Sequence, residues 1–144
     1  MSASKHRLYF LLQRAAHRLK TEADAALSEV GGLTTAQAAM MSIVAKDGPV
    51  TQKHIADTLL QRESAITAMA TRLLKAGYIS KVRSKADARA WSLQATPAGF
   101  AAIERMRGPF DQINAKLDAM LTESEVSKMA ECLKQISESF APED

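Results

Sequence analysis

Residues 51–79 of this 144-residue chain, TQKHIADTLLQRESAITAMATRLLKAGYI, decide its fold. Thr51 is a helix-capping residue, and the apolar residues after it predict a short helix that ends near Leu59. After a few polar residues a second amphipathic pattern continues to Ala76, where Gly77 is well placed to end the helix. Two short helices joined by a tight turn are the parts of a helix-turn-helix.

Two more helical patterns are predicted before this stretch. Residues 5–30 place apolar side chains three and four positions apart, and two glycines follow them. Thr34 or Thr35 caps a second helix that continues to Lys46, and the sequence Asp-Gly-Pro at 47–49 stops it. The helix-turn-helix therefore contains the third and fourth helices of the chain.

A β-hairpin and two helices are predicted after it. Residues 78–83 and 91–95 have the composition of short strands, and the loop between them is cationic. This hairpin is too small to be stable alone, so it has to pack on the helices. Thr96 followed by Pro97 predicts the start of a fifth helix, and residues 122–125, TESE, form a capping box for a sixth.

The composition limits the possible functions. No apolar run reaches the roughly 18 residues that cross a bilayer, and the charged residues 1–20 are unlike a signal peptide, so we expect a cytoplasmic protein with no membrane partner. The single cysteine excludes an intramolecular disulfide, and the three histidines lack metal-ligand spacing. No set of nucleophile, base and orienting acid can be assembled, so we expect neither an enzyme nor a cofactor.

Charge is distributed unevenly along the chain. Residues 46–90 contain nine lysines and arginines against four acids, whereas residues 111–144 contain three against eight. A helix-turn-helix followed at once by a cationic hairpin is typical of a winged helix-turn-helix, whose second helix enters the major groove of DNA. The basic segment would then neutralise phosphates, and the small side chains of the fourth helix would allow close approach to base edges.

Three stretches are informative together: GLTTAQAAMMSIVAKDGPVTQKHIADTL, ESAITAMATRLLKAGYI and DARAWSLQATPAGF. In the last of them Asp87 and Arg89 precede a strand, and Thr96 and Gly99 follow it. In these features the chain resembles the multiple antibiotic resistance regulator (MarR) family of transcription factors, whose wing carries Asp-x-Arg and then Thr-x-x-Gly. The resemblance covers nearly the whole chain.

The resemblance implies a mainly α fold with a small β-hairpin wing. It implies a single MarR-like chain, 1–144, with a winged helix-turn-helix lobe at 34–96 and dimerisation helices at 1–30 and 97–144. The function implied is that of a homodimeric, sequence-specific regulator, which we expect to be a ligand-responsive repressor. Its operator would be a pseudo-palindrome with half-sites roughly 10 base pairs apart. The sequence agrees on dimerisation, because the first and sixth helices are apolar on more than one side.

The residues expected to contact double-stranded DNA lie in the turn, the fourth helix and the wing. Arg89 is expected in the minor groove or on a phosphate, with its guanidinium oriented by Asp87. The expected DNA-binding residues are Gln61, Arg62, Ser64, Ala65, Thr67, Ala68, Thr71, Arg83, Lys85, Asp87 and Arg89.

Many members of the family release DNA when a small aromatic or anionic molecule fills a cleft between the dimerisation helices and the lobe. In this chain such an effector would contact Tyr9, Arg14 and His17 of the first helix, facing Met40 and Met41 of the second. In the alternative interpretation, the two methionines belong to the hydrophobic core.

The sequence allows two interpretations of three further features. Ala68 and Ala88 stand where the family often has longer polar side chains, so the second functional hypothesis is a winged-helix protein-interaction module that has lost specific DNA binding. Cys132 is either a redox sensor or, as we favour, a buried small apolar residue. Trp91 is interpreted as a packing residue of the hairpin rather than a base-stacking one.

Overall fold

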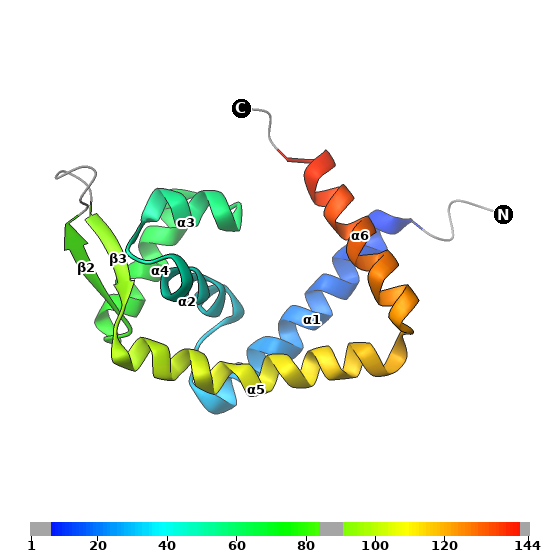
Figure 1. Ribbon diagram of the computed structural model, residues 1–144, viewed down its shortest axis with the longest axis horizontal. Coiled ribbons are helices and arrows are strands. Elements are labelled where there is room, and N and C mark those ends of the chain that lie inside the picture. The colour runs from blue at the N-terminus through cyan, green and yellow to red at the C-terminus, as the bar shows by residue number, and fades with distance from the viewer. Residues whose placement is uncertain (1–6, 84–90, 142–144) are drawn as a thin grey trace. The chain divides into compact units, whose positions relative to one another are not determined.

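The computed structural model describes residues 7–83 and 91–141, which contain six helices and three strands (Figure 1). In chain order these elements are α1 (Leu8–Val30), α2 (Thr35–Asp47), β1 (Val50–Thr51), α3 (Gln52–Leu59), α4 (Glu63–Lys75), β2 (Ile79–Arg83), β3 (Trp91–Ala95), α5 (Pro97–Met120) and α6 (Glu123–Ser139). The chain divides into two compact units, Met1–Pro109 and Phe110–Asp144, and α5 belongs to both. The expected winged helix-turn-helix is confirmed, and it lies in the first unit.

The helix starts follow the caps that the sequence predicted. Thr34 forms a capping box with Gln37: its hydroxyl accepts the Gln37 N–H at 3.1 Å, and the Gln37 side-chain oxygen accepts the Thr34 N–H at 3.0 Å. Thr51 accepts one backbone N–H of α3 at 3.1 Å. Thr122 and Glu125 form the second capping box, with both hydrogen bonds at 3.1 Å. Each cap satisfies N–H groups that the first turn of a helix would otherwise leave unpaired.

The sheet contains one strand more than the sequence predicted. β3 lies between β2 and the two-residue strand β1, and both pairings are antiparallel. Val50 of β1 pairs with Leu93, and Thr51 pairs with Ser92. Two residues carry no periodic signal, which is why the sequence indicated only the β2–β3 hairpin. Because β1 runs directly into α3, its pairing attaches the start of the helix-turn-helix to the wing.

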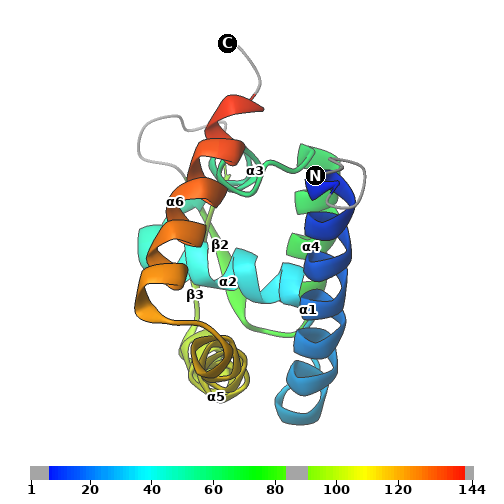
Figure 2. The same ribbon diagram turned by 90° about the vertical axis from the view of Figure 1, so that its right-hand side faces the viewer.

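The hydrophobic core of the first unit lies among α2, α3, α4 and the sheet, which gather together in both views (Figure 1, Figure 2). The largest fully buried side chains are Leu27, Met40, Met41, Val44, Ile55, Ile66, Leu73 and Leu93. Met40 and Met41 are both 0% exposed, so the structure places them in the core, as in the alternative interpretation of these residues. Leu27 brings the end of α1 into the same core.

Both ends of the chain expose apolar side chains. The exposed apolar residues at the start of α1 are Leu8, Tyr9, Phe10 and Leu11. Those of α6 are Met129, Leu133 and Ile136, and Phe140 follows at the C-cap of the helix. α6 contains no buried residue, and Cys132 on this helix is half-buried. Clusters of exposed apolar side chains are typical of surfaces that another protein covers.

Candidate nucleic-acid interface

Helices α3 and α4 pack against each other and are joined by a turn of three residues, 60–62. Leu60 ends α3 in a left-handed conformation, with φ 55° and ψ 42°. The N–H of Gln61 donates to the carbonyl oxygen of Ala56 at 3.0 Å, which satisfies the last turn of α3. The carbonyl oxygen of Arg62 accepts two N–H groups of the first turn of α4, at 3.0 and 3.2 Å. These hydrogen bonds end α3 and begin α4, although Arg62, the N-cap residue of α4, makes no side-chain cap hydrogen bond.

Helix α4 buries one side and exposes the other. The buried side consists of Ile66, Ala70 and Leu73. The exposed residues that the sequence predicted as DNA contacts, which we call the exposed α4 face, are Ser64, Thr67, Ala68 and Thr71. Gln61 and Arg62 are exposed just before this face, whereas Ala65 is half-buried. The structure thus brings the predicted residues of the turn and of α4 to one region of the surface.

The two threonines of this face use their hydroxyl protons within the protein. Thr71 Oγ1 donates to the carbonyl oxygen of Thr67 at 2.9 Å. Thr67 Oγ1 lies 3.0 Å from the carbonyl oxygen of Glu63 and 2.7 Å from Oε1 of Gln52 on α3. Lone pairs on both hydroxyl oxygens stay available to accept a hydrogen bond. Sequence reasoning missed Gln52, because no spacing rule connects residues that lie 15 positions apart on two helices.

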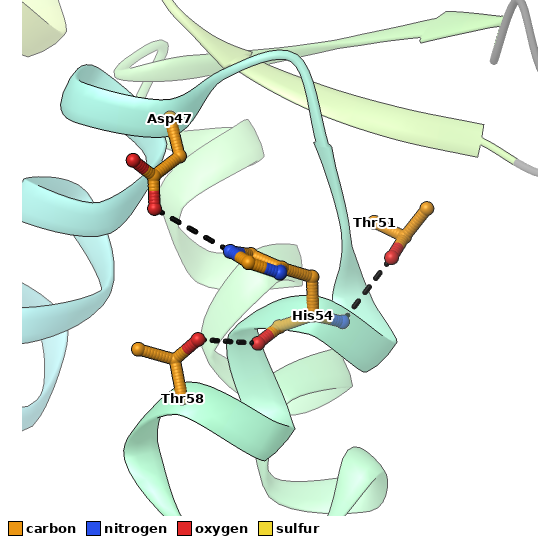
Figure 3. A network of polar contacts seen from close by, with 4 residues as sticks. All are labelled: Asp47, Thr51, His54 and Thr58. Carbon is orange, nitrogen blue, oxygen red and sulfur yellow. Dashed lines mark hydrogen bonds and ion pairs between the residues drawn. The ribbon is translucent and has the colours of Figure 1, made fainter.

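The amino end of α3 is held by contacts that Figure 3 shows in detail. The backbone N–H of His54 donates to Thr51 Oγ1 at 3.1 Å, and its carbonyl oxygen accepts the Thr58 hydroxyl at 2.8 Å. The His54 ring nitrogen Nε2 lies 3.4 Å from Oδ2 of Asp47, the last residue of α2. The ring contact is solvent-exposed and contributes little free energy by itself, but it joins α3 to the end of α2.

The wing places two of its cationic residues on strand β2. Lys81 and Arg83 are exposed there, and Arg83 pairs with Trp91 across the hairpin. The Arg83 guanidinium carbon lies 4.6 Å from the centroid of the Trp91 ring, which is a cation–π contact. The structure thus places Trp91 against its strand neighbour. The predicted tip residues Lys85, Asp87 and Arg89 lie outside the described residues.

The Thr-x-x-Gly pattern after the wing has a structural role. Thr96 Oγ1 donates to the carbonyl oxygen of Gly77 at 2.6 Å and accepts the N–H of Gly99 at 3.1 Å. The Thr96 N–H donates to the carbonyl oxygen of Tyr78 at 3.0 Å. A Cβ atom on Gly99 would overlap that same carbonyl oxygen. Thr96 and Gly99 therefore attach the start of α5 to the turn that follows α4.

The predicted effector-binding residues differ in how far they are exposed. Tyr9, Arg14 and His17 are exposed on α1, whereas Met40 and Met41 are enclosed in the core. A different hollow, of about 340 Å³, lies between α1, α2 and the helix-turn-helix. It is lined by Lys20, Ala36, Ala39, Leu59, Gln61, Ala65 and Met69. Its lining residues are mostly apolar, and Lys20 and Gln61 are the two polar ones among them.

Several features that would indicate other classes of site are not found in the part of the chain that the structure describes. There, no group of three or more His, Cys, Asp or Glu residues is placed to hold a metal ion. No helix of residues 7–83 and 91–141 is long and apolar enough to cross a membrane. Every buried side-chain nitrogen or oxygen in the same residues has a hydrogen-bond partner.

Comparisons with known proteins agree with this geometry. The model of the MarR family matches residues 31–90. Sco3205 from Streptomyces coelicolor, a MarR family transcriptional regulator in complex with DNA, has a TM-score of 0.88 at 18% identity, covering 99% of this chain and 91% of that one. The transcriptional repressor CouR bound to a 23-mer DNA duplex has a TM-score of 0.86 at 24% identity, covering 95% and 96%. S. aureus MepR in a DNA complex has a TM-score of 0.84 at 22% identity, covering 92% and 97%. No curated protein matches this chain by sequence.

Proposed function

This chain belongs to the MarR family of winged helix-turn-helix transcriptional regulators, and we propose that it is a homodimeric repressor of a pseudo-palindromic operator. On this proposal α4 enters the major groove, the wing lies on the flanking backbone or minor groove, and a small ligand relieves binding. Structures of the same fold include a transcriptional repressor bound to a DNA duplex, which supports the proposal. A repressor of this kind acts in the cytoplasm.

The observation that carries the proposal is the exposed α4 face. It combines small and hydroxylated side chains with a buried opposite side and a neighbouring helix that is capped and anchored. Small side chains let the helix backbone approach base edges closely, and the threonine hydroxyl oxygens can accept hydrogen bonds there. Lys81 and Arg83 are exposed on β2, a strand that contacts α4, and they add positive charge for phosphates.

The exposed apolar residues of α1 and α6 support the homodimer. Leu8, Tyr9 and Phe10 are each 60% exposed or more, and Phe140 is 84% exposed. Covering these side chains with a second copy removes apolar surface from water. A two-fold dimer presents two α4 helices, so its operator has two half-sites about one helical turn apart, roughly 10 base pairs.

DNA binding can be measured by fluorescence anisotropy with labelled duplexes from the promoter region of the chain's own gene. We expect a dissociation constant on the order of 10⁻⁸ M for the operator, at least about a thousandfold tighter than for scrambled DNA, and a steep loss of affinity with salt. Weak binding that is indifferent to sequence would contradict the proposal and favour the protein-interaction module.

The proposed role of the wing is tested by Arg89→Ala. Loss of a phosphate or minor-groove contact should weaken binding to all sequences and reduce the slope of log K against log salt by about 1. Lys128→Ala on α6 is the matched control, because it also removes one positive charge. Lys128 pairs with Glu131 in the second unit and is not an expected DNA contact. An Arg89→Ala protein that binds with the parent's affinity and slope would show that the wing assignment is wrong.

The proposed response to a ligand is supported by the hollow that Lys20 and Gln61 line. A small aromatic carboxylate suits a mostly apolar lining that includes the cationic residue Lys20, and it would contact Gln61 in the turn that leads into α4. We expect benzoate to release the operator and Lys20→Ala to raise the benzoate concentration required by roughly tenfold, the effect of losing one charge-assisted contact. If Lys20→Ala releases the operator at the same benzoate concentration as the parent, the effector binds elsewhere.

A further inference from the structure

A side-chain hydrogen bond joins α3 and α4 on the exposed side of the helix-turn-helix. Thr67 Oγ1 lies 2.7 Å from Oε1 of Gln52 and 3.0 Å from the carbonyl oxygen of Glu63. A hydroxyl group carries one proton, and the shorter of the two distances matches the usual length of an O–H···O hydrogen bond. We therefore assign the proton of Thr67 to the Gln52 oxygen.

This bond determines what Gln52 offers to a partner. A carboxamide holds its oxygen and its nitrogen on opposite arms, and the oxygen arm of Gln52 is directed at Thr67. The nitrogen arm carries two N–H donors that the bond does not use. Gln52 is half-buried, so part of its side chain is accessible to an incoming molecule. The matching partner is therefore a hydrogen-bond acceptor.

The surroundings of Gln52 favour an anionic acceptor. Gln52 is the first residue of α3, where the unpaired N–H groups of a helix carry a partial positive charge. Lys53 follows it and is exposed, and the first turn of α3 contains no acid. A DNA phosphate is an anion with acceptor oxygens, and phosphates border the groove that the neighbouring α4 is proposed to enter.

We propose that Gln52 donates a hydrogen bond to a DNA phosphate and that Thr67 holds it in the orientation for that contact. This inference rests on the proposed DNA-binding function. The phosphate contact comes from α3 and the base contacts from α4, so the Gln52–Thr67 hydrogen bond connects the two. It fixes the register in which the exposed α4 face meets the base edges.

The decisive variant is Gln52→Glu, which has nearly the same shape. Its carboxylate accepts the Thr67 proton as the carboxamide does, but it has no N–H donor and it brings a negative charge to the phosphate. We expect affinity for operator DNA to fall about a hundredfold in Gln52→Glu. It should fall about tenfold in Gln52→Ala, which loses only the N–H donor. If Gln52 only holds Thr67 in place, Gln52→Glu binds like the parent, and the proposal is overturned.

The matched control is Gln112→Glu, an exposed residue of α5 in the second unit, which makes the same change in charge. It should bind DNA like the parent. Thermal unfolding and sedimentation of each variant show that it is folded and in the parent's oligomeric state. An equal loss of affinity in Gln112→Glu would attribute the effect to net charge and would overturn the proposal.

Selection from a random-sequence duplex library separates this inference from the function on which it rests. A parent protein that enriches no sequence overturns both. If the parent enriches a motif, Gln52→Ala should enrich the same motif with weaker binding, because a phosphate contact carries no sequence information. A changed base preference in Gln52→Ala would mean that Gln52 contacts a base, and the phosphate assignment would be wrong.

Two further measurements test the contact and its coupling. A neutral methylphosphonate at the contacted phosphate should weaken DNA binding by the parent and leave binding by Gln52→Ala unchanged. If the loss from the methylphosphonate and the loss from Gln52→Ala add at every phosphate tested, the contact is contradicted. Thr67→Val should weaken the parent more than it weakens Gln52→Ala, because the two residues share one hydrogen bond. Thr21→Val is its control, since the Thr21 hydroxyl donates to a carbonyl oxygen of α1 in the same i−4 geometry.

Discussion

Leu60 lies in the turn of the helix-turn-helix with φ 55°, and its side chain is 73% exposed. A left-handed conformation costs a residue with a Cβ atom roughly 1 kcal/mol, and an exposed side chain recovers little of that by burial. Gly99 presents the opposite case, because its lack of a Cβ is what lets α5 approach the Tyr78 carbonyl. Single backbone positions therefore set the geometry on both sides of α4.

Replacing Leu60 by glycine should raise the free energy of unfolding by about 0.5–1 kcal/mol, since the relief of the left-handed conformation exceeds the entropy that glycine adds to the unfolded chain. Urea denaturation measures the change. Ala76→Gly is the control, because Ala76 ends α4 with φ −74° and has no such strain to relieve. A Leu60→Gly protein that loses as much stability as Ala76→Gly would show that Leu60 is not strained.

Gly99→Ala should lower the free energy of unfolding by roughly 2–3 kcal/mol. The new methyl group would meet backbone as well as Met41 Cε at 2.9 Å. Gly108→Ala, in the same helix, has no atom within 4 Å of the added carbon. It should be close to neutral, because the helix propensity that alanine adds is offset by its position before Pro109. Thermal and urea unfolding compare the two variants, and equal effects would mean that the close approach at Gly99 is not required.

At the scale of the element, a single threonine hydroxyl caps the start of each of α2, α3 and α6. The sequence left open whether Thr34 or Thr35 caps α2, and the structure assigns the cap to Thr34. Thr35 is instead held through its backbone N–H, which donates to Asp24 Oδ1 of α1 at 2.6 Å. A side-chain cap and a backbone contact respond differently to alanine.

Thr34→Ala should therefore destabilise the lobe by about 1 kcal/mol, the usual cost of losing a threonine cap. Thr35→Ala retains the backbone N–H and should change stability by less than about 0.5 kcal/mol. Both values come from urea denaturation followed by circular dichroism. A larger loss of stability in Thr35→Ala than in Thr34→Ala would identify Thr35 as the cap.

At the scale of the whole molecule, the open question is what covers the apolar side chains of α1 and α6. In α6 the residues Met129, Leu133 and Ile136, together with Phe140 at the C-cap, recur at spacings of three and four, so they share one side of the helix. Our proposal assigns their partner to a second copy of the chain. The same contact would hold two α4 helices at the separation that an operator requires.

Leu133→Asp should raise the dissociation constant of the dimer by roughly tenfold or more, because it places an unpaired charge in an apolar interface. Sedimentation velocity over a dilution series measures this constant, and operator affinity should fall with it. Ser127→Asp adds the same charge on the opposite side of α6 and should leave the dimer intact. A Leu133→Asp protein that dimerises like the parent would show that this side of α6 is not the interface.

The sequence alone determined the helices, their caps and the composition of the exposed α4 face. Caps and amphipathic stripes are local patterns. Thr34, Thr51 and Thr122 each accept a hydrogen bond from a residue three positions away, so these caps can be predicted from the sequence. The Asp-x-Arg and Thr-x-x-Gly motifs of the family could be recognised for the same reason, because their residues lie close together in sequence.

Only the tertiary structure decided which distant residues meet. The pairing of β1 with β3, the burial of Met40 and Met41, the close approach at Gly99 and the Gln52–Thr67 hydrogen bond all join separate elements. Each depends on how helices and strands pack, and packing follows from the combined shape of many side chains rather than from any local pattern. For that reason the sequence identified the helix proposed to bind DNA, while its partner on α3 emerged from the fold.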